Sequence, residues 1–199
     1  MDKETVRQFF DACAPDWDAD MHRSDEVIAR ILDGACVQAG STVLDVACGT
    51  GVLFPDYLAR GVKSVTAIDL SPEMVKIARG KTKGMPIEVI CGDAGHYDFG
   101  REFDCVVVYN AFPHFPEPEH TVAALARLVR HGGTLTVAHG MSRAKLLQHH
   151  SGRAKDVSVE LLECSALSSL FAPYFDVTVE ISDEEMYQVT GVKKGREKT

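Results

Sequence analysis

Three aspartates recur at matching places in the first half of the chain. Asp45, Asp69 and Asp93 each lie at or near the end of a short apolar run. Such runs are typical of buried strands in a parallel sheet, and ligands bind such sheets beyond the carboxyl ends of the strands. A carboxylate at that edge can accept hydrogen bonds from ribose hydroxyls. One aspartate alone could instead cap a helix or lie in a solvated turn, but three at equivalent places indicate a shared site.

A glycine-rich turn follows the first of these aspartates. The stretch Val43–Leu53 reads VLDVACGTGVL, an apolar strand that runs into Gly49 and Gly51 and then into a helical pattern. Glycine permits positive φ and lets a ligand approach the backbone closely. A strand that feeds such a turn at a helix N-terminus favours a nucleotide-like ligand. For the turn alone, an ordinary strand-to-helix connection is the competing interpretation.

The turn also discriminates between two classes of ligand. An aspartate about 20 residues past the glycines, as Asp69 is, suits the ribose of a dinucleotide or of an adenosyl amino acid. A dinucleotide fingerprint needs glycine or alanine at the third position of G-x-G-x-x-G/A, where this chain has Phe54. A bulky side chain there argues against a pyrophosphate. An acid just before the turn, Asp45, suits a ligand that carries an ammonium group.

Alternating strand and helix patterns position these residues. The expected strands are 43–47, 64–70, 87–93, 103–110, 134–140, 175–182 and 186–194. The expected helices are 2–13, one that begins after Ser24, 51–60, one that begins at Pro72, 120–130, 142–150 and 158–171. The connection between the last two strands is too short for a parallel crossover, so they pair as an antiparallel hairpin or lie apart. The pattern predicts one α/β domain with a mostly parallel sheet.

Composition and charge narrow the functional class. The chain has 199 residues, 45% of them hydrophobic and 25% charged, with a formal net charge of −8. This balance indicates a globular protein and argues against a nucleic-acid partner held by phosphate contacts. No apolar run approaches the length of a membrane span, and the polar start does not resemble a signal peptide. Six cysteines without a CxxC pair suggest reduced thiols. We therefore expect a cytoplasmic protein with no membrane or nucleic-acid partner.

Five successive motifs resemble those of class I S-adenosylmethionine-dependent methyltransferases. They read VLDVACGTGVL, VTAIDLSPEMV, CGDAGHYDF, FDCVVVYNAFPHF and HGGTLTVAHG. The closest likeness, over about residues 40–140, is to the small-molecule type related to ubiquinone and menaquinone biosynthesis methyltransferases. The resemblance implies S-adenosyl-L-methionine as cofactor, a small-molecule methyl acceptor, and a Rossmann-like seven-stranded, mostly parallel sheet with helices on both faces and an antiparallel C-terminal strand. It implies one domain over 1–199, with a helical cap (1–40), a cofactor-binding core (41–140), and substrate-side helices with a β-hairpin (141–199).

The resemblance assigns cofactor contacts residue by residue. The residues implied along the methionine part are Asp45, Ala47, Gly49 and Gly51. Those implied at the ribose and adenine are Asp69 for the ribose hydroxyls, Leu70 and Met74 against the adenine, Asp93 for the adenine amino group, and Ala94 beside the ring. Those that border the methionine and the transferred methyl are Asn110 and Ala111. Ala47 replaces the first glycine usual in this family, and alanine is a small substitute.

Histidines cluster where the methyl acceptor is expected, beyond the fourth and fifth strands. His114 and His139 are the catalytic candidates, as a general base or a substrate contact, although His114 could instead bond its own loop. A metal site of His139, His149, His150 and Cys164 is the sharper hypothesis. Adjacent histidines on a helix point about 100° apart, however, and no strong ligand spacing is present. We therefore predict no metal.

Two other functional classes stay open from the sequence. One is a nucleotide-dependent oxidoreductase, which Phe54 disfavours, and the other is a non-catalytic S-adenosylmethionine-binding regulatory protein. The fourth strand is followed by NAFPHF rather than the Asn/Asp-Pro-Pro-Tyr/Phe sequence of amino-methylating nucleic-acid enzymes. The lone Trp17 could lie at the edge of the core or act as a lid over the cofactor. The acceptor atom and the oligomeric state are open as well.

Overall fold

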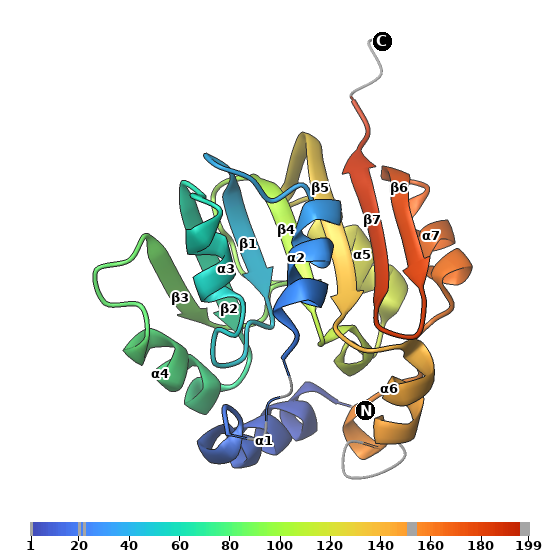
Figure 1. Cartoon of the computed structure of the whole chain (residues 1–199). Helices are drawn as coiled ribbons and strands as arrows, with labels where there is room; N and C mark the ends of the chain where they lie inside the picture. The colour runs from blue at the N-terminus through green and yellow to red at the C-terminus, as the bar shows by residue number, and fades with distance from the viewer. Residues whose placement is uncertain (1, 20, 22, 151–154, 196–199) are drawn as a thin grey trace.

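A single sheet organises the part of the chain that the computed structural model describes, residues 2–19, 21, 23–150 and 155–195 (Figure 1). Its seven strands are β1 (Thr42–Val46), β2 (Ser64–Asp69), β3 (Ile87–Cys91), β4 (Phe103–Tyr109), β5 (Val129–His139), β6 (Phe175–Ser182) and β7 (Tyr187–Lys193). Their spatial order is β3-β2-β1-β4-β5-β7-β6. Strands β1 to β5 pair in parallel, and β7 is antiparallel to both β5 and β6. The predicted fold class, with its C-terminal hairpin, is confirmed.

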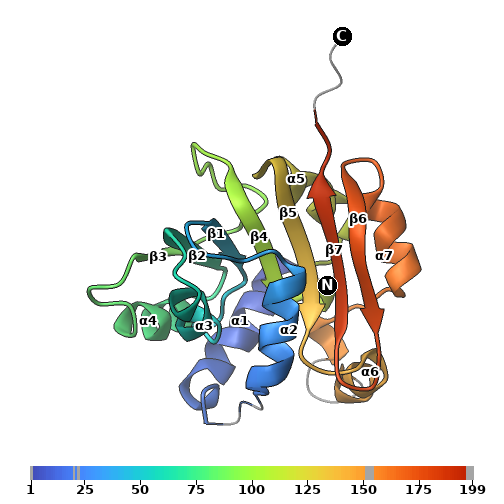
Figure 2. The same cartoon turned by 45° about the horizontal axis from the view of Figure 1, so that its top comes forward.

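Helices cover both faces of this sheet (Figure 2). On one face pack α2 (Asp25–Gly34), α3 (Phe54–Ala59) and α4 (Pro72–Gly80), and on the other pack α5 (Pro118–Ala126) and α7 (Cys164–Phe171). Helix α4 begins as its sequence predicts, because the Ser71 side chain accepts a hydrogen bond from the backbone N–H of Met74 and proline occupies the first turn. In the described residues, no helix is long and apolar enough to cross a membrane.

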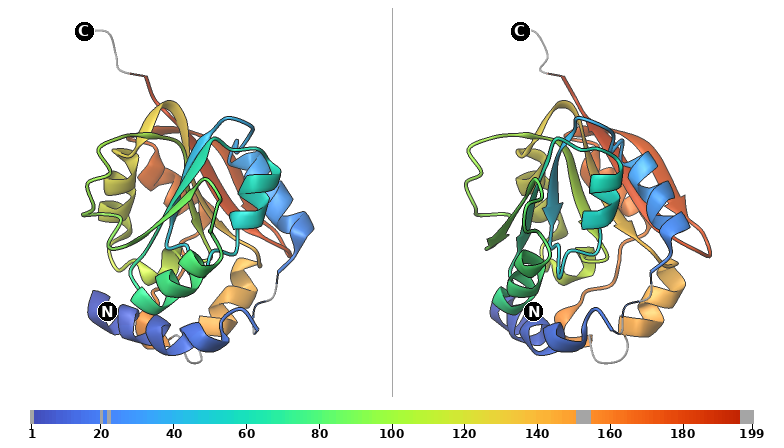
Figure 3. Two further views of the ribbon diagram at one scale, coloured as in Figure 1. Left: turned by 90° about the vertical axis from the view of Figure 1, so that its left-hand side faces the viewer. Right: turned by 60° about the vertical axis from the view of Figure 1, so that its left-hand side comes forward.

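Two further helices lie beyond the carboxyl ends of the parallel strands (Figure 3). They are α1 (Lys3–Cys13) and α6 (Arg143–His150). Between α1 and α2 runs a short 3-10 helix, η1 (Ala14–Asp16), and two others are η2 (Phe112–His114) and η3 (Lys155–Val157). The chain before β1 and the chain after β5 therefore both return to the edge at which a parallel sheet binds its ligands.

Some predicted helix bounds are wrong. The helix expected over 51–60 begins only at Phe54, because the chain still turns at Gly51, where φ is +87°. The helix expected over 120–130 runs from Pro118 to Ala126, and β5 already begins at Val129. Gly133 lies inside that strand, where a Cβ atom would sit 2.7 Å from the carbonyl oxygen of Asp104.

The helix expected over 158–171 is also wrong for its first six residues. Only Cys164–Phe171 is helical, as α7. Residues 158–163 are not helical: the N–H of Val159 donates to the carbonyl of Pro113 at 2.8 Å, and Leu161 is buried in the core. Leucines at helical spacing indicated a helix, but their burial here comes from packing against residues far away in sequence.

Candidate functional site

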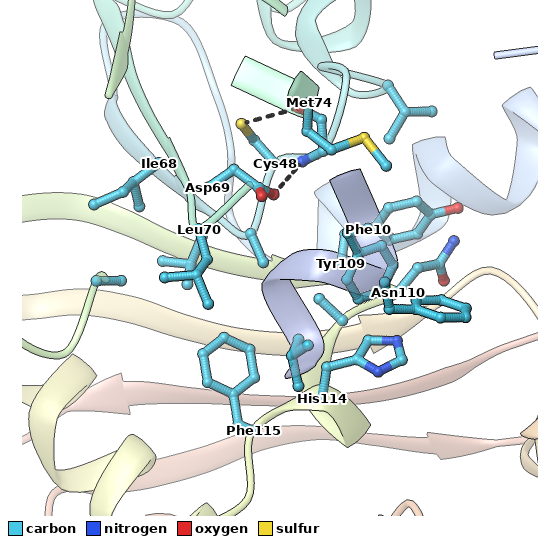
Figure 4. A pocket seen from close by; sticks show the side chains of 18 of the residues that line it. Phe10, Cys48, Ile68, Asp69, Leu70, Met74, Tyr109, Asn110, His114 and Phe115 are labelled. Atoms are coloured by element: carbon cyan, nitrogen blue, oxygen red, sulfur yellow. Dashed lines mark hydrogen bonds between the residues drawn. The ribbon is translucent and has the colours of Figure 1, made fainter. Parts of the chain in front are cut away.

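A cavity of about 730 Å³ opens at the carboxyl ends of the parallel strands. Its walls come from the ends of β1, β2, β3 and β4, from α1, and from α6. Figure 4 shows Asp69, Asn110 and His114 around this one hollow. A cavity of this size at this edge is typical of cofactor and substrate sites in α/β proteins.

Most of the predicted site residues line this cavity. Those that do are Ala47, Gly49, Asp69, Leu70, Met74, Asp93, Ala94, Asn110, Ala111 and His114. Asp45 and Gly51 are not among the lining residues, and neither is His139. The structure thus brings the first group together, while the contacts assigned to each residue stay predictions.

The glycine turn has a backbone that few residue types adopt. Gly49 has φ +54°, and Ala47, where the family usually has glycine, has φ +55°. Asn110, just after the neighbouring strand β4, has φ +54°. Positive φ in non-glycine residues is uncommon, and such strain gathers at binding sites. Gly51 also has positive φ, +87°, and a Cβ there would lie 2.3 Å from the ring of Phe54.

Asp69 connects the glycine turn to the end of β2. Its Oδ2 accepts from the N–H of Gly49 at 2.7 Å, and its Oδ1 accepts from the N–H of Ser71 at 2.9 Å. Burial raises the pKa of Asp69 above its ordinary value, although these backbone bonds oppose the shift. The carboxylate is therefore held in one orientation at the cavity wall.

Asp45 lies close to that site but is enclosed in the protein. Its relative exposure is 2%. Burial, with a smaller contribution from the negative charge of Asp69, raises the pKa of Asp45 to about 8. Two buried acids so close together favour a cationic or hydrogen-bond-donating ligand nearby.

Asp93 is already paired in this structure. Its Oδ2 lies 2.5 Å from Nζ of Lys3 and 2.9 Å from Nδ1 of His96, and its Oδ1 accepts from the N–H of Gly95 at 2.9 Å. Burial by itself would raise the pKa of Asp93, but the hydrogen bonds from Lys3 and Gly95 lower it below the usual value. A ligand that donates a hydrogen bond to Asp93 would share this carboxylate with Lys3 of α1.

The two catalytic candidates occupy different environments. His114 lines the cavity from η2, and its ring meets the ring of Phe10 edge-on with centroids 4.8 Å apart. His139 ends β5 with no exposed surface, and its ring lies 6.1 Å from that of Tyr187 in β7. Of these two histidines, therefore, only His114 lines the cavity.

Several lining residues were not predicted as site residues. Lys3, Val6, Phe9 and Phe10 of α1 line the cavity, and Tyr109 lines it from the end of β4. The helical cap expected over residues 1–40 places α1 over the site, but no individual residue of α1 was assigned to it. Trp17 also lines the cavity: a Cβ at Gly49 would lie 3.8 Å from its Nε1. The next residue, Asp18, accepts from the Thr50 hydroxyl at 2.5 Å.

Metal-ligating groups do not gather in the part of the chain that the structure describes. Among these residues no three His, Cys, Asp or Glu side chains are placed to hold an ion. The side chains of His149 and His150 lie outside the described residues.

The comparisons with known proteins agree with this geometry. Residues 43–133 match a family model described as methyltransferase domain. Ubiquinone biosynthesis O-methyltransferases from Xanthomonas oryzae pv. oryzae and Xanthomonas campestris pv. campestris are 36% and 35% identical to this chain over 128 residues. Each match covers 60% of this chain and 53% of the relative. The chain thus spans about half the length of the curated relatives it matches.

Solved structures share the fold over almost the whole chain. The putative methyltransferase in complex with the Haloferax volcanii Trm112 activator superposes with a TM-score of 0.81 at 21% identity, covering 98% of this chain and 100% of that one. The magnesium protoporphyrin IX methyltransferase of Synechocystis, solved with bound S-adenosylhomocysteine, gives 0.73 at 18% identity, covering 97% and 100%.

The fold and its cavity define a Rossmann-like protein with a large cavity at the carboxyl edge of its sheet. Residues 43–133 match the methyltransferase domain family, and the fold is shared with solved methyltransferases.

Proposed function

We propose that this protein transfers a methyl group from S-adenosylmethionine to a small-molecule acceptor. The observation that carries the proposal is the shared cavity, where Asp69, Asp93 and Asn110 meet at the ends of three different strands within a methyltransferase domain. Carboxylates suit the ribose hydroxyls and the adenine amino group of an adenosyl amino acid.

The proposed cofactor contacts are those that the motifs imply. Asp69 binds the ribose, Leu70 and Met74 pack on the adenine, and Asp93 and Ala94 meet its edge. Ala47, Gly49, Asn110 and Ala111 border the methionine part and the reacting methyl, and Asp45 and Gly51 support this turn from behind the cavity wall. The placement of the first nine in one cavity supports these roles.

The remainder of the cavity suits an apolar acceptor. Its described lining there is mainly aromatic or aliphatic: Phe9, Phe10, Trp17, Phe115, Met141 and Leu146. Such walls bind a hydrophobic molecule and exclude water, which favours methyl transfer over hydrolysis. Because the curated relatives are named ubiquinone biosynthesis O-methyltransferases, we propose a hydroxyl group as the first acceptor to test.

His114 is the proposed general base. S-adenosylmethionine supplies a methyl group on a positively charged sulfur, which is a good leaving group. As the acceptor forms its bond to the methyl carbon, the carbon–sulfur bond breaks, its electron pair stays on sulfur, and the acceptor proton passes to His114. His139 is the weaker catalytic candidate, because it lies enclosed beside β7.

We also propose that the chain acts as one cytoplasmic domain, with residues 1–40 as a helical cap and 141–199 on the substrate side. The placement of α1 and α6 at the cavity supports this division. Free thiols at Cys36, Cys48, Cys91, Cys105 and Cys164 support a reducing compartment.

Calorimetric titration with S-adenosylhomocysteine tests the proposal. We expect saturable binding by the wild type, and a loss of at least about tenfold in affinity in Asp69→Asn, because one ribose acceptor becomes a donor. Asp176→Asn, at an exposed position of β6, is the matched control and should bind like the wild type. Trp17 is the only tryptophan in the chain, so its fluorescence should change with the same dissociation constant.

Four outcomes would count against this function. Wild-type protein that binds no S-adenosylhomocysteine, or Asp69→Asn that binds it normally, contradicts the cofactor site. Binding without turnover of labelled S-adenosylmethionine against a pool of metabolites favours a regulatory protein instead. Binding of a nicotinamide dinucleotide in place of S-adenosylhomocysteine favours the oxidoreductase alternative.

A further inference from the structure

One segment of the chain is hydrogen-bonded to η2. This strap, defined as residues 157–163, runs from Val157, the last residue of η3, to Glu163, the residue before α7. The N–H of Val159 donates to the carbonyl of Pro113 at 2.8 Å, so the strap is joined to the backbone of η2 one residue before His114. Val157 and Leu161 are buried, with relative exposures of 3% and 1%.

The strap is also tied to α6. Arg143 donates from Nε to the carbonyl of Leu161 at 2.8 Å, and its guanidinium pairs with Glu160 at 2.7 Å and with Glu163 at 2.6 Å. Bonds at both ends therefore hold the strap against the cavity loop that carries His114. A strap fixed in this way can hold a side chain in a definite orientation.

One ring nitrogen of His114 is bonded to this strap. Its Nδ1 lies 2.8 Å from the carbonyl oxygen of Val157 and 3.2 Å from the hydroxyl oxygen of Ser158. A carbonyl oxygen can only accept a hydrogen bond, so Nδ1 must carry the proton. In the neutral imidazole, the lone pair then belongs to Nε2.

We propose that Val157 and Ser158 are positioning residues that hold His114 as the tautomer with a basic Nε2. The inference rests on the proposed function of the cavity as a methyl-transfer site. Phe10 of α1 meets the His114 ring edge-on, so the ring is held between the strap and the roof of the cavity. During transfer, the acceptor proton goes to Nε2, while Nδ1 keeps its proton and its bond to Val157. The resulting imidazolium is stabilised because its N–H donor is charged.

Nitrogen NMR of the neutral histidine ring tests the tautomer directly. In protein labelled with ¹⁵N-histidine, long-range ¹H–¹⁵N spectra distinguish the Nδ1–H form from the Nε2–H form, and His114→Gln identifies the signal. We expect the Nδ1–H form for His114. A predominant Nε2–H form overturns the inference. This measurement needs no acceptor, and calorimetry with S-adenosylhomocysteine reports separately on the proposed function.

A pair of variants tests whether the strap is the cause. Val159→Pro removes the N–H that bonds Pro113, whereas Val159→Ala keeps it, and the Val159 side chain is 37% exposed. We expect Val159→Pro to shift His114 toward the Nε2–H form and to lower kcat several-fold, with cofactor affinity unchanged. Val159→Ala should match the wild type. A folded Val159→Pro protein that retains the Nδ1–H form overturns the role of the strap. If that variant does not fold, the wild-type spectrum still decides the tautomer.

Discussion

At the scale of single residues, the site is built from groups that are costly to bury. Asp45 and Asp69 are both enclosed, and burial raises the pKa of each. Ala47 and Asn110, which follow the adjacent strands β1 and β4, adopt positive φ at the cavity. These costs persist only where the surrounding structure over-determines them, and a bound ligand that donates hydrogen bonds would offset them. The raised pKa values of these two aspartates should therefore be visible in how the protein's stability depends on pH.

The pH dependence of stability should report on Asp45. Its pKa in the folded protein is about 8, whereas an unfolded aspartate titrates near about 4. The folded state thus holds a proton that the unfolded chain releases, so the contribution of Asp45 to stability is largest below about pH 4 and falls as pH rises toward 8. Asp45→Asn removes this titration. At pH 8 we expect it to be more stable than the wild type by about 1–3 kcal/mol.

Urea unfolding at pH 5.5 and at pH 8 measures this difference. The exposed Asp176→Asn is the control, and it should follow the wild type at both values. If wild type and Asp45→Asn lose stability in parallel between the two pH values, Asp45 is ionised in the folded protein and the prediction is wrong.

At the scale of secondary-structure elements, α1 is the roof of the cavity. Contacts that join it to the sheet edge include Lys3 to Asp93 at 2.5 Å and the Ser71 hydroxyl to Asp11 at 2.5 Å. The first occupies the carboxylate that is proposed to meet the adenine amino group. If Asp93 meets the adenine amino group as proposed, the cofactor and Lys3 would compete for this carboxylate.

Removal of the Lys3 ammonium should relieve this competition. We expect Lys3→Met to bind S-adenosylhomocysteine several-fold more tightly, because Asp93 then becomes available as an acceptor. Stability should change by less than about 1 kcal/mol, since the lysine side chain is 53% exposed and such pairs contribute little. Calorimetry measures the affinity. Lys76→Met, which removes an exposed pair with Glu73, is the control and should leave affinity unchanged. Weaker binding by Lys3→Met would show that Lys3 supports the cofactor site.

At the scale of the whole molecule, the position of β7 between β5 and β6 completes the sheet. The pairing brings Gly191 of β7 against α7 and β6: a Cβ there would lie 2.6 Å from the Cβ of Phe175 and 3.1 Å from the ring of Phe171. A close approach of this kind tolerates no side chain without movement of the strand or the helix.

Gly191→Ala should therefore destabilise the fold. Overpacking of this kind costs about 1–3 kcal/mol, which corresponds to a fall in Tm of about 2–12 °C for a chain of this length. Gly80→Ala is the matched control, because a Cβ at that helix position meets nothing within 4 Å. Thermal unfolding followed by circular dichroism compares the two. An unchanged Tm for Gly191→Ala would show that the sheet adjusts at low cost.

The sequence by itself determined the strands, the glycine turn, the Ser71 cap and the edge at which Asp69 and Asp93 lie. These features follow from local patterns, and parallel strands place their carboxyl ends at one edge wherever they occur. The placement of Ala47, Gly49 and Asn110 in one cavity follows from the same rule.

Only the tertiary structure decided which side chains of the expected helical cap meet that edge and which histidine reaches it. Lys3 meets Asp93 across 90 residues of sequence, and residues 158–163 are not helical although their spacing predicts a helix, because Val159 bonds the loop of His114. His114 follows β4 and His139 ends β5, yet the β5–β7 pairing sets His139 opposite Tyr187, where it is buried. The periodicity of apolar residues predicts which face of an element is apolar. It does not predict which distant segment of the chain packs against that face.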